Sequence, residues 1–141
     1  MWSRRQLLVA GGVWSAAPLV SGCSSGPTYD EVVQATWRHV SPASSDRVAV
    51  LRTLVRYATL APSSHNTQCW RFRLEDRGIQ IEPDLTRRCP VVDPDDHHLF
   101  VSLGCAAENL AQAAAAHGLE ANGRFVPSGT GRYVVSLISA P

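Results

Sequence analysis

Apolar residues recur along this chain with two different periods, and each period predicts a different kind of element. Between residues 46 and 61 they lie three and four positions apart, which predicts a helix capped by Ser44 or Ser45 and ended by Pro62. The buried stripe of this helix is expected to contain Val48, Leu51, Val55 and Ala58. A shorter helix is predicted from Thr28, its cap, to about Val40.

The longest helix is predicted from about Asp96 to His117, and Gly118 is expected to stop it. One face of this helix gathers the residues Leu99, Leu103, Ala106, Leu110, Ala114 and His117. Its many alanines leave the other faces narrow, so a second helix could approach closely.

From Trp70 onward the period changes to two, which predicts strands. Residues 69–83 are expected to form a hairpin around Asp76-Arg77-Gly78, and two further strands are expected at 119–126 and 132–139. The predicted class is therefore α+β, with an antiparallel sheet packed against helices. The last strand is expected to leave an unpaired edge, which a partner or a missing C-terminal part would cover.

The residues from Ala61 to Phe72 form a polar loop between a helix and a strand. Its six short polar side chains are Ser63, Ser64, His65, Asn66, Thr67 and Gln68. A loop fixed at both ends can present hydroxyls and amides in set directions to a planar ligand. The alternative interpretation is a capped helix end and an ordinary polar turn.

The first 22 residues have the features of an export signal. The pair Arg4-Arg5 precedes a weakly apolar stretch that is too short and too broken to span a bilayer. The pair resembles a twin-arginine signal, which serves proteins that fold before export, and Val20-Ser21-Gly22-Cys23 resembles a lipobox. We therefore expect residues 1–22 to be removed, Cys23 to carry a lipid that anchors the chain to a membrane, and the protein to lie in the cell envelope.

The charge of the chain and its remaining polar motifs argue against a nucleic-acid partner and against a metal site. The chain has 13 basic and 12 acidic residues, and the predicted signal removes two arginines and no acid, so a nucleic-acid partner is not expected.

Adjacent side chains on a helix point in different directions, so Asp95-Asp96-His97-His98 is expected to cap a helix rather than to bind a metal. Arg88 and Asp93 are expected to pair, and Cys69, Cys89 and Cys105 leave room for one disulfide of unspecified pairing.

The segments 58–72 (ATLAPSSHNTQCWRF) and 84–110 together resemble the flavin-dependent nitroreductase superfamily, and its Acg-like branch in particular. The resemblance covers roughly residues 46 to 140, so it implies a partial nitroreductase-like FMN-binding domain at 46–141, preceded by a tether and short helix at 23–45. It implies a homodimer with flavin at the subunit interface. It also implies hydride transfer from NAD(P)H through FMN to a small aromatic acceptor such as a nitroaromatic or quinone, with no side chain as nucleophile.

The resemblance places the FMN ring contacts on Pro62, Ser63, Ser64, Asn66 and Gln68. Three departures limit what it implies. Cys69 replaces a proline that the superfamily usually has. An arginine-rich phosphate grip is missing, with Trp37-Arg38-His39, Arg52 and Arg56 as the nearby candidates, and the superfamily's later flavin contacts lie beyond the matched part. A non-catalytic flavin-binding module and a truncated remnant therefore remain as alternatives.

Overall fold

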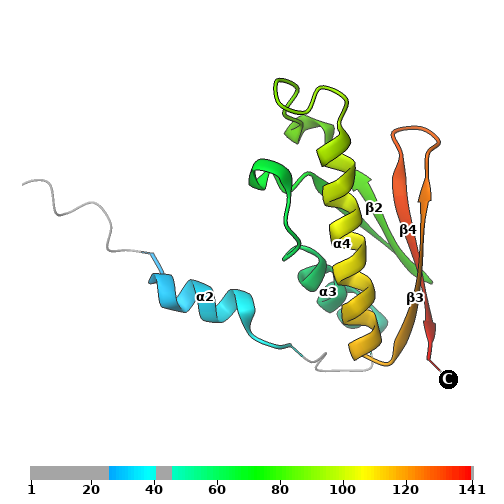
Figure 1. Cartoon of the computed structure of the whole chain (residues 1–141). Helices are drawn as coiled ribbons and strands as arrows, with labels where there is room; N and C mark the ends of the chain where they lie inside the picture. Colours follow the sequence, from blue (N-terminus) through cyan, green and yellow to red (C-terminus); the bar gives the residue numbers. More distant parts are fainter. Residues whose placement is uncertain (1–25, 41–45, 141) are drawn as a thin grey trace, which may run out of the picture. The chain divides into compact units, whose positions relative to one another are not determined.

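The structure is a computed structural model that describes residues 26–40 and 46–140. The predicted export signal, Cys23 and the proposed caps Ser44 and Ser45 lie outside these residues. The chain divides after His39 into two units, and each is described by itself. Figure 1 shows the helix of the first unit and the helices and sheet of the second.

Within residues 26–39, the part of the first unit that the structure describes, there is one helix, α2 (Tyr29–Trp37). Thr28 caps its N-terminus, as predicted, and together with Glu31 it forms a capping box. The Glu31 backbone N–H donates to Thr28 Oγ1 at 3.3 Å, and the Thr28 backbone N–H donates to the Glu31 carboxylate at 2.7 Å. These reciprocal bonds satisfy two donors that a helix end otherwise leaves unpaired. No residue of α2 is buried, so local bonds define this helix.

The second unit begins its regular structure with α3 (Arg47–Ala58). Asp46 caps it by accepting from the Ala49 backbone N–H at 3.1 Å. The predicted stripe was right at Leu51 and Ala58 but wrong at Val48, which is 46% exposed, while Leu54 is fully buried. The buried stripe of α3 therefore runs through Leu51, Leu54 and Ala58, which lie three and four positions apart on one face of the helix.

The central helix is α4 (His97–Ala116), and its buried face is the predicted one. Five of the six stripe residues are buried and His117 is half-buried. Gly118 follows with a φ of +70°, so it ends the helix in the left-handed conformation that favours glycine. By length and composition alone α4 could cross a membrane, but its apolar stripe packs on the sheet as that of a core helix does.

The sheet has the strand order β1-β2-β4-β3 and every pairing is antiparallel. Its strands are β1 (Trp70–Glu75), β2 (Gly78–Pro83), β3 (Leu119–Val126) and β4 (Arg132–Ser139). The predicted hairpin and both later strands are confirmed. The prediction of an unpaired edge on the last strand is wrong, because β4 lies between β2 and β3 and pairs with both.

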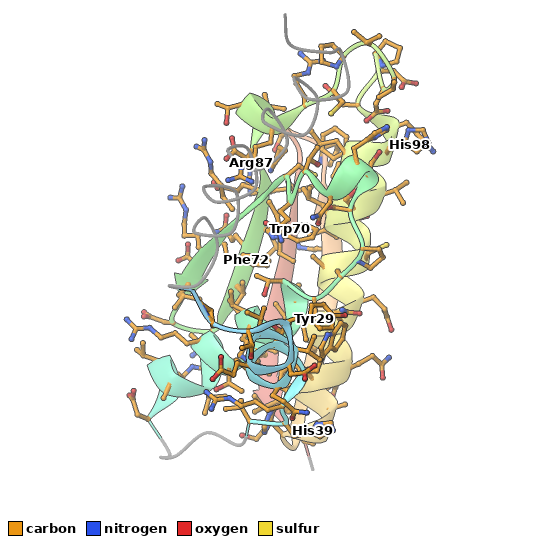
Figure 2. The ribbon with its side chains drawn as sticks, turned by 90° about the vertical axis from the view of Figure 1, so that its left-hand side faces the viewer. Tyr29, His39, Trp70, Phe72, Arg87 and His98 are labelled. Carbon is orange, nitrogen blue, oxygen red and sulfur yellow. The ribbon has the colours of Figure 1, made fainter. Side chains whose placement is uncertain are left out.

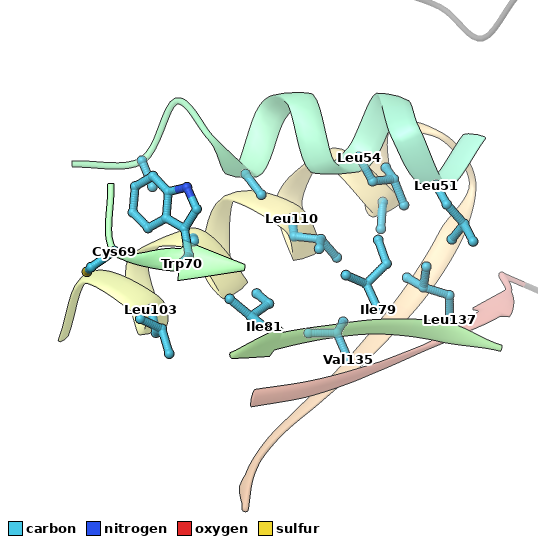
Figure 3. Packing of buried hydrophobic residues seen from close by; sticks show 14 of the residues in the cluster. Leu51, Leu54, Cys69, Trp70, Ile79, Ile81, Leu103, Leu110, Val135 and Leu137 are labelled. Carbon is cyan, nitrogen blue, oxygen red and sulfur yellow. The ribbon is translucent and has the colours of Figure 1, made fainter. Parts of the chain in front are cut away.

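Both α3 and α4 cover one face of the sheet, and the core lies between them (Figure 3). Ile79 and Ile81 of β2 and Val135 and Leu137 of β4 point into this layer, which confirms the alternation of buried and exposed positions. Two short 3-10 helices, η1 (Ser64–Asn66) and η2 (Leu85–Arg87), lie in the loops before β1 and after β2. The fold is thus α+β, with a four-stranded antiparallel sheet under two helices.

Candidate functional site

The polar loop after α3 has an unusual backbone. His65, Asn66 and Gln68 all have positive φ values, of 53°, 53° and 49°. Residues other than glycine rarely adopt this region, and each such residue costs about 1–2 kcal/mol. Bonds within the loop hold it: the Asn66 N–H donates to Ser63 O at 2.9 Å, and the Gln68 N–H donates to Ser63 Oγ at 3.0 Å.

The loop is attached to α4 through Ser102. The Ser64 backbone N–H donates to Ser102 Oγ at 3.1 Å, and that hydroxyl donates to His98 O at 2.7 Å. Ser102 is only 3% exposed and lies beside the apolar stripe of α4. Ser102 was not among the residues predicted for the site, although a serine between Phe100 and Leu103 in an apolar helix was a usable signal.

A second attachment comes from the segment after β2. The Arg87 guanidinium donates to Thr67 O at 3.0 Å, and the Asp84 backbone N–H donates to Cys69 O at 2.9 Å. Figure 2 shows Arg87 and His98 on either side of this region, with Trp70 below them. The loop is therefore held from two sides by elements far apart in the sequence.

Asp84 organises this second attachment. Its carboxylate accepts from Thr86 Oγ1 at 2.6 Å and from Arg71 Nη2 at 2.8 Å. The Thr86 hydroxyl and the Arg71 guanidinium lower the pKa of Asp84 to about 2. Asp84 therefore stays ionised under ordinary conditions and keeps these partners in place.

Asp93 caps α4 from outside the helix. Its two carboxylate oxygens accept from the backbone N–H groups of His98 and Leu99 at 3.0 and 2.9 Å. Burial favours the neutral acid, but these two bonds and the nearby His98 and His97 hold the pKa of Asp93 below its usual value. The predicted pair of Arg88 with Asp93 is wrong. Arg88 pairs with Asp96 at 2.7 Å, because both oxygens of Asp93 face the helix N-terminus.

The five residues predicted to contact the FMN ring lie together on the loop, but they differ in exposure and in whether their polar groups already have hydrogen-bond partners. Pro62 is exposed, Ser63 Oγ accepts a loop bond, and Ser64 Oγ is 2.9 Å from His65 Nδ1. The side-chain amides of Asn66 and Gln68 are exposed and have no hydrogen-bond partner within the described residues. The cavity beside the loop is about 10 Å³, so the loop presents an edge of polar groups without enclosing a ligand.

The predicted candidates for gripping the FMN phosphate were Arg52, Arg56 and Trp37-Arg38-His39. Arg52 is exposed, and the Arg56 guanidinium lies 5.5 Å from the centre of the Tyr57 ring. Trp37, Arg38 and His39 belong to the first unit.

In the part of the chain that the structure describes, no three potential ligands cluster as a metal site would require, and each cysteine is a free thiol. Cys69 is fully buried in the core and its thiol lies 3.8 Å from Leu99 O.

The chain is similar to part of several mycobacterial proteins. A Mycobacterium tuberculosis (strain H37Rv) protein named "Putative NAD(P)H nitroreductase" is 37% identical over 73 residues, which are 50% of this chain and 21% of that protein. The M. tuberculosis "Putative NAD(P)H nitroreductase acg" is 30% identical over 79 residues, or 56% of this chain and 24% of its own length. The chain thus matches under a quarter of the length of these relatives.

No protein-family model matches the chain. The similarity to the M. tuberculosis proteins covers half of it or slightly more, at 30–37% identity. These matches support a nitroreductase-like oxidoreductase family for this chain.

Proposed function

We propose that this chain is part of an FMN-dependent NAD(P)H oxidoreductase of the nitroreductase type. The polar loop would hold the ring of FMN through Ser63, Ser64, Asn66 and Gln68, and Pro62 would set the start of the loop. The observation that carries the proposal is the loop itself, whose strained backbone is fixed from two sides and whose two amides have no partner in the described chain. Strain that is maintained in this way is typical of ligand-binding loops.

The available groups fit the edge of an isoalloxazine ring. That edge has alternating hydrogen-bond acceptors and a donor, and an amide side chain can both donate and accept. Asn66 and Gln68 supply two such amides, and the hydroxyl of Ser64 supplies a further group beside them. The chemistry of the donor set therefore suits FMN. The enclosing walls do not come from this loop alone, because the cavity beside it is about 10 Å³.

Bound FMN would supply the redox chemistry, by accepting a hydride from NAD(P)H and passing it to a small aromatic acceptor. The residues of this chain have the separate task of holding the ring. Ser102 and Arg87 fix the loop at Ser64 and Thr67, so Asn66 and Gln68 lose little further freedom when a ligand binds. No nucleophilic side chain is required.

Two further parts of the proposal concern assembly and location. A homodimer would provide the second wall of the flavin site, which the small cavity beside the loop leaves open. Lipid attachment at Cys23 after removal of residues 1–22 would place the protein at a membrane on the extracytoplasmic side of the cell envelope, where a flavin acquired before twin-arginine export would already be bound.

The proposal is tested by titrating the purified chain with FMN and following flavin absorbance and fluorescence. Asn66→Ala and Gln68→Ala should each weaken FMN binding by about threefold to tenfold, since one net hydrogen bond contributes about 0.5–1.5 kcal/mol. The control is Asn122→Ala, which removes an exposed amide of β3 that donates to Glu120 Oε1 at 3.1 Å. If the chain binds no FMN, or if all three variants bind it equally, the proposed site is wrong.

A non-catalytic flavin-binding module is the second candidate, and the small cavity beside the loop favours it. Such a module would bind FMN but would not turn over NADH or NADPH with a nitroaromatic. Stopped-flow absorbance of the bound flavin separates the two functions. Bleaching by either nicotinamide, followed by reoxidation when the nitroaromatic is added, identifies the oxidoreductase and excludes the module.

A further inference from the structure

A groove of about 620 Å³ lies between the start of α4 and the turn that joins β3 to β4. Figure 1 shows these two segments at the same end of the second unit. The volume is within the range of about 300–1,000 Å³ that small-molecule sites occupy. The groove lies along Phe100 and Val101, whereas the polar loop contacts α4 through Ser102, so α4 presents a different flank to each.

Three aromatic rings form the floor of this groove. Phe125 lies 5.8 Å from Phe100 at an interplanar angle of 80°, and 5.2 Å from Tyr133 at 56°. Gly131 makes room for this arrangement, because a Cβ there would lie 3.0 Å from the Phe100 ring and 3.1 Å from the Phe125 ring. Phe125 nevertheless remains 44% exposed, so part of a fixed aromatic surface faces the groove.

The polar side chains that line the groove include one negatively charged residue, Asp95, among the described residues. Asp95 is the carboxylate among the lining residues that the structure describes, and within those residues its side chain accepts one long hydrogen bond, from the His97 backbone N–H at 3.4 Å. The neighbouring acids are engaged elsewhere, since Asp96 pairs with Arg88 and Asp93 caps α4. The hydroxyls of Thr130 and Tyr133 make no hydrogen bond within the described residues.

We propose that this groove binds a small aromatic organic cation, with its ring or methyl groups against Phe100 and Phe125 and its positive charge toward Asp95. Aromatic faces attract cations, and a nearby carboxylate adds to this attraction. A neutral aromatic molecule would use the rings alone, and an anion would be repelled by Asp95. The site is independent of the proposed flavin loop, because none of its residues belongs to that loop.

The test uses the full chain and three probes of similar size: benzyltrimethylammonium, benzyl alcohol and benzoate. Saturation-transfer NMR and probe titrations should show binding in the order cation, alcohol, anion. Asp95→Asn should weaken binding of the cation by about threefold to fivefold, as expected for a partly exposed charge pair, and should leave the alcohol unchanged. Phe125→Ala should weaken binding of both the cation and the alcohol by about threefold or more.

Asp76→Asn is the matched control, because it makes the same charge change in the exposed turn between β1 and β2. It should leave the binding of all three probes unchanged. Equal binding of the three probes, or a cation preference that survives Asp95→Asn, would overturn the proposal. So would a self-associated chain that excludes the probes, since the groove would then be an interface between copies. Binding here does not require FMN, so failure of either proposal can be recognised separately.

Discussion

Removal of the Ser102 hydroxyl is the sharpest test of how the polar loop is held. Ser102→Ala deletes the acceptor of the Ser64 N–H and the donor to His98 O. The second loss costs little, because a serine bond to the carbonyl four residues earlier only supplements a helix. The first leaves an amide without its protein partner at a position where Ser102 was 3% exposed, which costs about 1–2 kcal/mol. Alanine fills nearly the same volume, so no cavity adds to this.

Thermal unfolding followed by circular dichroism measures this loss. In a domain of this size, about 1 kcal/mol lowers Tm by roughly 4–8 °C. Amide hydrogen exchange locates the effect, because the Ser64 N–H should lose its protection while the amides in the middle of α4 keep theirs. Ser136→Ala, on the exposed face of β4, is the matched control and should change neither measurement. An unchanged Tm together with an unchanged exchange rate at Ser64 would refute the reasoning.

Three further predictions follow from the same structure. The pKa of Asp84 lies at about 2 in the folded chain against 3.8 for the free group, so its contribution to stability is complete above pH 3.8 and is lost as the pH falls toward 2. Asp84→Asn removes this contribution, so between pH 5 and pH 2 the Tm of the variant should fall less than the Tm of the unsubstituted chain. Gly131→Ala should lower the free energy of unfolding by about 1–3 kcal/mol more than Gly129→Ala in urea titrations, because both positions have positive φ but only Gly131 contacts rings. Equal losses would exclude that contact as the cause. Gln68→Gly should relieve a strained φ of 49° and leave Tm equal or higher while FMN binding weakens; a marked fall in Tm would show that the strain is not there.

The sequence predicted those features that depend on neighbours along the chain. The stripe of α4, the stop at Gly118 and the hairpin around Asp76 and Arg77 all follow from short-range periodicity and turn chemistry. It also predicted that the polar loop lies between a helix and a strand, and that α4 begins near Asp96.

The features that it missed depend on contacts between distant segments. The position of β4 in the middle of the sheet depends on its pairing with β2, about 55 residues earlier, and no local pattern encodes that pairing. The choice of Asp93 over Asp96 as the acceptor for α4 depends on how residues 84–96 fold back. The positive φ values of the loop depend on Ser102 and Arg87, which hold it from two sides.

The central position of β4 has a consequence for how this chain reaches its fold. Of the four strands that the structure describes, the one that joins the two halves of the sheet comes last in the chain, and until Arg132–Ser139 is available the β1–β2 hairpin and β3 share no strand pairing. The sheet therefore forms by insertion of β4 between the β1–β2 hairpin and β3, after both are present. A nascent chain on the ribosome can form α3, the first hairpin and α4 in turn, but these four strands are joined into one sheet only after Arg132–Ser139 has been synthesised.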